Sequence, residues 1–156
     1  VIPDGSTAEL FGAGSVTPTF VADVPGQYVV SLIVDDGIVS SQPSIVTVTA
    51  VSYEDHLTGG LVELLEQVNT FPEVTFANKN MRKTLGNKIN AVIAKIEEGD
   101  YAGALDKMRN DLAPKMDGCA LGEEDRNNDW VAGCEEQAQA YPLVLEIIEF
   151  LEQMLS

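Results

Sequence analysis

Four oxygen-bearing side chains in the last third of the chain have the spacing of a calcium-binding loop. Asp125, Asn127 and Asp129 alternate along the sequence, and Glu136 follows eleven residues after the first of them. This spacing reproduces positions 1, 3, 5 and 12 of an EF-hand loop, where alternate side chains point at one ion and the last glutamate closes the shell. The sixth position, normally glycine because the loop turns sharply there, is Trp130, which we expect to anchor the loop by packing. The spacing predicts a calcium site. The alternative interpretation is an acidic loop that is exposed to solvent and only connects two elements.

Conventional catalytic motifs are missing from the sequence. The single histidine, His56, has no nearby Ser or Cys motif, and we expect it to lie on the surface or at the entry of a helix. The sequence contains no Gly-x-Ser-x-Gly, no His-Glu-x-x-His and no phosphate-binding glycine loop. A glycosidase-like carboxylate pair depends on distances that the sequence does not fix. We therefore expect a protein that is not an enzyme and requires no cofactor, with calcium as the one candidate ligand.

The charge balance limits the classes of partner. The 156 residues contain 25 acidic and 9 basic side chains, for a net charge of −16. Nucleic acids and anionic membrane surfaces need basic patches, so neither is an expected partner, whereas cations and basic partners are compatible with this charge. No run approaches the ~20 apolar residues of a membrane-spanning helix, so we expect no membrane insertion. If the protein is secreted, its leader is expected upstream of Val1.

The first fifty residues have the composition of strands and turns. They contain no Lys or Arg and are rich in Val, Thr, Ser, Gly and Pro. We predict four strands, near residues 7–11, 17–22, 27–35 and 43–49. Pro25 and Gly26 set a turn before the third strand. In that strand the residues predicted to face a core are Tyr28, Val30, Leu32 and Val34.

Helical spacing of apolar residues replaces this pattern from residue 52 onward. Leucines at 57, 61 and 64 begin the first predicted helix, the second covers about 85–96, the third runs from Asp100 to a stop at Pro114, and the last covers 141–155. Gly99 suits the residue after a helix and Asp100 suits an N-cap. The four helices predict a small bundle. The expected organisation is therefore a β module at 1–50, a linker at 51–57 and a helical domain at 58–156.

The segment from about residue 3 to 50 resembles the C-terminal part of a PKD domain, an immunoglobulin-like module. The resemblance rests on Asp23-Val-Pro-Gly-Gln-Tyr-Val-Val-Ser-Leu-Ile-Val-Asp-Asp-Gly37, with supporting runs at 3–10, 17–23 and 44–49. It implies a tyrosine corner, in which the hydroxyl of Tyr28 ties back to upstream backbone. A complete sandwich needs about seven strands and ~100 residues, so the module is expected to be partial. Either another chain completes it, or the sequence is a fragment cut inside a domain.

The helical segment, from about 56 to 155, resembles domains that trail Ig-like modules in large bacterial surface proteins. The matching runs are Lys115-Met-Asp-Gly-Cys119, Asn128-Asp-Trp130 and Cys134. A tetratricopeptide hairpin around 98–105 is the alternative, but a solenoid needs repeated units and no second copy follows. The resemblance implies a bacterial surface protein and does not imply an activity.

The two cysteines of the chain are predicted to form a disulfide. Cys119 and Cys134 are an even pair beside an extracellular-type module, separated by 15 residues. Such a bond stabilises the fold by roughly 3 kcal/mol through loop closure. Zinc would need two more soft ligands, and the Cys-x-x-Cys of redox and haem sites is missing.

Together these patterns predict an α+β protein, a partial Ig-like β-sandwich followed by a small disulfide-stapled helical bundle. The expected function is structural or interactive, in assembly or adhesion at a bacterial cell surface or outside the cell. The expected partner is another protein chain that completes the β module, including a second copy of this chain in a filament or oligomer. The alternatives are an accessory module of a larger secreted enzyme and a calcium-dependent binding module.

Overall fold

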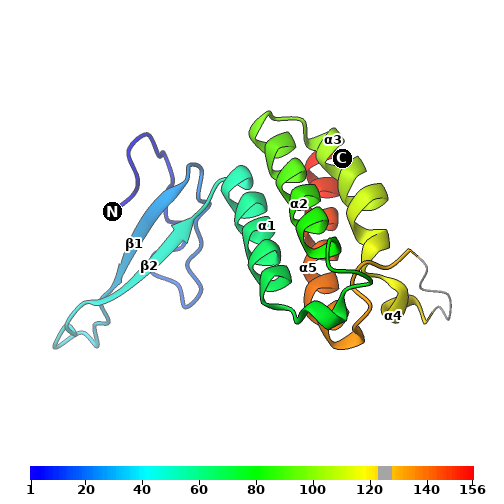
Figure 1. Cartoon of the computed structure of the whole chain (residues 1–156). Helices are drawn as coiled ribbons and strands as arrows, with labels where there is room; N and C mark the ends of the chain where they lie inside the picture. Colours follow the sequence, from blue (N-terminus) through cyan, green and yellow to red (C-terminus); the bar gives the residue numbers. More distant parts are fainter. Residues whose placement is uncertain (123–127) are drawn as a thin grey trace. The chain divides into compact units, whose positions relative to one another are not determined.

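The computed structural model of the chain describes residues 1–122 and 128–156 and separates them into two units, Val1–Tyr53 and Glu54–Ser156. The first unit contains a two-stranded antiparallel sheet and the second contains the helices α1 to α5 (Figure 1). The predicted α+β class is therefore confirmed, whereas a full β-sandwich is not present in these residues. Helix α1 begins at Tyr53, so the last residues of the expected 51–57 linker form its first turn.

The sheet consists of β1, Gly26–Leu32, and β2, Ser44–Ala50, paired over their full length with Val29 opposite Thr47. Gly26 adopts a φ of 139°, and a Cβ there would lie 2.7 Å from Pro3, so the turn before β1 requires glycine. β1 stops at Leu32, short of the predicted residue 35. Beyond it, the amide of Ser41 donates to the carbonyl of Val34 and an isolated bridge joins Asp35 to Ser40. The side chain of Asp36 accepts hydrogen bonds from the amides of two following residues within this turn.

The predicted strands at 7–11 and 17–22 are not formed as strands. Phe11 and Thr19 exchange both backbone hydrogen bonds, at 2.8 and 3.0 Å, but this isolated bridge does not extend. The turn at Gly12 brings the two segments together at one point, and residues 1–53 supply no further strand beside them. A ladder needs a partner for each backbone group, so these segments remain irregular.

The helices agree with the predicted periodicity, with two changes at their ends. The bounds are α1 Tyr53–Thr70, α2 Met81–Glu97, α3 Tyr101–Lys107, α4 Gly118–Leu121 and α5 Cys134–Leu155. Asp100 caps α3 as predicted, because its side chain accepts from the amide of Gly103 at 2.9 Å. The α-helix ends at Lys107, before the predicted stop at Pro114, and the chain continues as a π turn, Met108–Leu112, and a 3₁₀ turn, Ala113–Lys115, which contains Pro114.

Helix α5 begins seven residues before the predicted start at 141, and Pro142 lies inside it. Proline lacks the amide that would bond the carbonyl of Ala138, four residues earlier. Ala138 is exposed, so solvent can hydrate that carbonyl. The prediction was wrong because it placed the proline at a helix start, whereas one lost hydrogen bond is tolerable on a solvated helix face.

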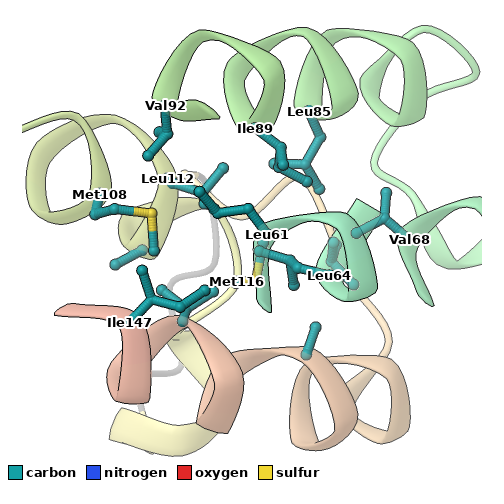
Figure 2. Packing of buried hydrophobic residues seen from close by; sticks show 14 of the residues in the cluster. Leu61, Leu64, Val68, Leu85, Ile89, Val92, Met108, Leu112, Met116 and Ile147 are labelled. Atoms are coloured by element: carbon teal, nitrogen blue, oxygen red, sulfur yellow. The ribbon is translucent and has the colours of Figure 1, made fainter. Parts of the chain in front are cut away.

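The hydrophobic core belongs to the helical unit. Buried side chains from α1, α2, α5 and the 108–116 segment meet at its centre (Figure 2). α1 contributes Leu57, Leu61, Leu64 and Val68, whose spacing places them on one face of the helix. Burying each such side chain stabilises the fold by about 1.5–3 kcal/mol, so this unit has an apolar core of its own.

Candidate functional site

The β unit leaves most of its large apolar side chains exposed. Within residues 1–53, all of which are described, Tyr28 is the one buried hydrophobic residue. Its exposed large hydrophobic residues are Val1, Ile2, Leu10, Phe11, Val16, Val21, Leu32, Ile33, Val34, Ile38, Val39, Ile45, Val46, Val48, Val51 and Tyr53. Exposed apolar surface on this scale marks an interaction surface in most proteins, so the β unit is the leading candidate site.

The hydroxyl of Tyr28 is tied to the upstream backbone as predicted. It donates to the carbonyl of Val24 at 2.8 Å and accepts from the Val24 amide at 3.1 Å, and it also lies 3.1 Å from a carboxylate oxygen of Asp23. Hydrogen bonds from the hydroxyl of Ser6, the amide of Thr7 and the Thr7 hydroxyl lower the pKa of Asp23 well below its usual range. This network fixes the turn before β1.

The predicted inward face of β1 is uncovered beyond Tyr28 and Val30. Leu32, the last residue of β1, and Val34, two residues beyond it, are each 60% exposed, although the predicted strand places them on the same face as Tyr28. The paired strand β2 is exposed from Ser44 to Thr49. Two strands cannot bury either face by themselves. Within this unit the cover is confined to the region of Tyr28, whose ring centre lies 5.3 Å from that of Phe20, and the apolar residues farther along the sheet are exposed.

The outer edge of β1 carries a short added pairing and an apolar hollow. The amide of Val29 donates to the carbonyl of Val1 at 2.8 Å, and the terminal amino group of Val1 donates back to the carbonyl of Val29 at 2.8 Å. Beside this pair lies a hollow of about 220 Å³. Its lining is mainly apolar and comprises Val1, Ile2, Ala8, Glu9, Leu10, Phe20, Tyr28, Val29, Val30 and Ser31.

In the helical unit, Cys119 and Cys134 form the predicted disulfide, with 5.5 Å between their Cα atoms. The bond joins α4 to the first residue of α5. Between them, residues 128–133, which we call the strap, are held by backbone hydrogen bonds. Ala77 donates to the carbonyl of Trp130 at 3.0 Å, and Ala132 donates to that of Thr75 at 2.6 Å. The disulfide and the strap together fix the connection into α5.

The structure places two of the four predicted calcium ligands, because Asp125 and Asn127 lie outside the described residues. Asp129 is buried, and its carboxylate accepts from the Gln137 amide at 2.8 Å and from the Gly118 amide at 3.4 Å. Glu136 is half-buried in the first turn of α5. Within the residues that are placed, no three His, Cys, Asp or Glu side chains gather as a metal-binding group.

Gln137 is a buried polar residue that sequence reasoning missed. Its side-chain amide donates to Asp129 and to the carbonyl of Val131, at 2.8 and 2.6 Å, and its carbonyl accepts from the amide of Cys119 at 2.8 Å. Burial raises the pKa of the neighbouring Asp117, and the charge of Asp129 adds to that rise. Gln137 lies on the buried face of α5 together with Ala140, Val144, Ile147 and Leu151, and its place on this apolar stripe is the one sequence signal of its burial.

Trp130 packs against the core as predicted and also carries two cations on its ring. The ammonium groups of Lys88 and Lys115 lie 5.5 and 5.2 Å from the ring centre. Lys115 also donates to the side chain of Asn128 at 2.5 Å. These contacts hold the strap against the second helix and against the turn before α4.

A second hollow, of about 300 Å³, lies at the start of α2 and is lined by Asn69, Glu73, Phe76, Asn78, Lys79, Arg82 and Lys83. The guanidinium of Arg82 stacks on Phe76 and donates to the carbonyl of Phe71. Lys79 and Lys83 form no ion pair with the described part of the chain. Glu73 lines the same hollow and opposes binding of an anion, so this hollow is a weaker candidate than the β unit.

Two further expectations concern the helices. His56 is exposed in the first turn of α1, as predicted, with its ring 4.6 Å from that of Phe150. None of the helices in the described ranges combines the length and the apolar character required to cross a membrane.

The chain matches none of the protein families, curated proteins and solved structures with which it was compared. The resemblances to PKD domains and to helical domains of bacterial surface proteins therefore stay predictions.

Proposed function

We propose that this chain is a non-enzymatic structural or interaction protein whose first 53 residues form an incomplete β module, completed by strands of another polypeptide chain. One observation supports this most strongly. The β unit has one buried hydrophobic residue, Tyr28, and sixteen large hydrophobic residues that are exposed. Covering a Val, Leu or Ile side chain contributes about 1.5–3 kcal/mol, so even a few covered residues would supply substantial binding energy.

The sheet favours added strands over a small-molecule ligand. Both outer edges belong to strands, β1 and β2, with no third strand beside them in residues 1–53. An unpaired strand edge provides a row of backbone donors and acceptors for another chain. The apolar residues lie along both strands rather than in one deep pocket, which fits a partner as long as the sheet.

The helical unit provides a separately folded base for this module. Its core includes Leu61, Ile89 and Leu151, all fully buried, and its disulfide suits an oxidising compartment outside the cytosol. We propose an extracellular or cell-surface location, where a PKD-like β module and a stapled helical domain act in assembly or adhesion.

Sedimentation velocity of the chain, combined with amide NMR spectra, tests this proposal. We expect either concentration-dependent association or a monomer in which residues 26–50 give poorly dispersed signals. A stable monomer with well-dispersed β-type signals for these residues would contradict the proposal, because the β module would then be complete without a partner.

A further inference from the structure

Three cations of the helical unit have no carboxylate partner, although the chain contains 25 acidic residues. In the described part of the chain, Lys79, Arg82 and Lys83 form no ion pair. The other basic side chains of this part have polar partners: ion pairs for Lys88, Lys95, Lys107 and Arg109, and a hydrogen bond to Asn128 for Lys115. The three unpaired cations all line one feature, the hollow of about 300 Å³ at the start of α2.

The sequence around this hollow is basic in an otherwise acidic chain. Residues 74–96 contain five basic side chains and no acidic one, and the first turn of α2 has no acidic side chain. Cations at the N-terminal end of a helix are unfavourable because they lie beside the positive end of its dipole. The arrangement therefore works against the stability of α2, and a bound carboxylate would offset that cost.

Glu73 adds one negative charge to the lining and restricts the chemistry of the ligand. Among the described residues its carboxylate forms no ion pair, although Lys79 and Lys83 line the same hollow. A simple anion would be repelled by Glu73. A ligand that carries an ammonium group beside its carboxylates would instead match both signs of charge.

The hollow also contains hydrogen-bonding groups with spare capacity. Arg82 donates from a terminal nitrogen to the carbonyl of Phe71, but its Nε is a buried donor without a partner among the described residues. Buried donors are normally paired, so Arg82 retains a donor for an acceptor in the hollow. The side-chain amides of Asn69 and Asn78 line the same hollow and can donate or accept.

The size of the hollow and the charge of the chain favour a small ligand over a polymer. A volume of about 300 Å³ lies at the lower end of the ~300–1,000 Å³ of small-molecule sites. A polyanion would extend beyond residues 74–96 and meet the negative charge of the rest of the chain, which gives the net charge of −16. A small ligand keeps its charges beside the hollow, because salt screens more distant charges beyond about 8 Å.

We infer that this hollow binds a small acidic amino acid, a ligand with two carboxylates and one ammonium group. Lys79, Arg82 and Lys83 attract the carboxylates, and Glu73 attracts the ammonium group. The site belongs to the helical unit and does not depend on the proposed function of the β unit. Since Glu73, Lys79 and Lys83 are exposed, each contributes a modest energy, and the expected affinity is in the millimolar range.

The probe is glutamate, titrated into the isotope-labelled chain at constant pH and ionic strength, with binding followed by the amide NMR signals of residues 69–83. Two analogues each lack one feature of glutamate. Glutarate has no ammonium group, and γ-aminobutyrate has a single carboxylate. We expect glutamate to bind at least about threefold more tightly than either analogue, and the side-chain amide signals of Asn69 and Asn78 to shift.

Single variants that remove one charge test the assigned roles. Lys79→Gln and Lys83→Gln should each weaken glutamate binding at least about threefold. Glu73→Gln should reverse the preference, so that glutarate binds more tightly than glutamate. The matched control is Lys107→Gln, because Lys107 lies on α3 and already pairs with Asp111 at 3.9 Å. This control should change glutamate affinity by less than about 1.5-fold.

The outcomes that contradict the inference are distinct. Glutarate binding as tightly as glutamate to the wild type, or an unchanged preference in Glu73→Gln, would overturn the ligand class. Unchanged binding in both lysine variants, or an equal loss in Lys107→Gln, would overturn the site. The absence of any shift in residues 69–83 at millimolar glutamate would overturn the inference as a whole. Well-dispersed helix signals in each variant establish that lost binding is not lost folding.

Discussion

Replacement of Gln137 by leucine should strongly destabilise the helical unit. The glutamine is 1% exposed and satisfies three groups, the carboxylate of Asp129, the carbonyl of Val131 and the amide of Cys119. Leucine has a similar size, so the main cost is the unpaired polar groups rather than a cavity. Asp129 and Val131 are buried, and leaving a buried polar group without a hydrogen-bond partner costs about 1–3 kcal/mol. The expected loss is about 2–6 kcal/mol.

Urea unfolding followed by the fluorescence of Trp130 measures this loss, because the single tryptophan of the chain lies next to Asp129. The same substitution at Gln153, an exposed residue of the same helix, is the matched control and should change stability by less than about 0.5 kcal/mol. A loss below about 1 kcal/mol in Gln137→Leu would refute the reasoning, since the polar groups would then have other partners.

Three further predictions follow from the disulfide, the turn before β1 and the acidic loop. Cys119 and Cys134 should resist alkylation until reduced, and reduction should destabilise the helical unit by about 3 kcal/mol; full labelling of native protein would contradict this. Because the folded state lowers the pKa of Asp23, its stabilising effect should be present above the unfolded pKa of about 4 and fade as pH falls below it. NMR of Tyr28 should show that pH dependence in the wild type and not in Asp23→Asn. Calcium should change tryptophan fluorescence in the wild type but not in Glu136→Gln. An equal response to magnesium or salt would contradict the predicted calcium site.

The sequence was a sufficient guide to elements whose stabilising contacts repeat at short spacing. The spacing of Leu57, Leu61 and Leu64 predicted α1, because a helix buries one face and its period is visible in the residues themselves. Asp100 was recognisable as an N-cap for the same reason, since its partner is three residues away. The hydroxyl tie of Tyr28 also joins residues close in sequence, but it was predicted from the resemblance to immunoglobulin-like modules.

Features that depend on distant segments were not predictable. The segments 7–11 and 17–22 have strand-like composition, but a strand forms only where a partner lies beside it. Gln137 contacts Cys119 across 18 residues, and only the folded strap brings the two together. That the sheet would be left uncovered was predicted from the small number of strands. The hollow beside Val29, in contrast, depends on Leu10 and Phe20, and no local sequence pattern determines where these two residues lie.

Amide hydrogen exchange on the monomeric chain tests the central claim, that the β unit is incomplete, most directly. Exchange protection follows the buried contacts and local stability of each segment. We predict that amides of β1 and β2 exchange at least about 100-fold faster than those in the middle of α1, α2 and α5, and that they become protected when a strand binds. Equal protection of β1, β2 and these helices in a monomer without a partner would contradict the claim.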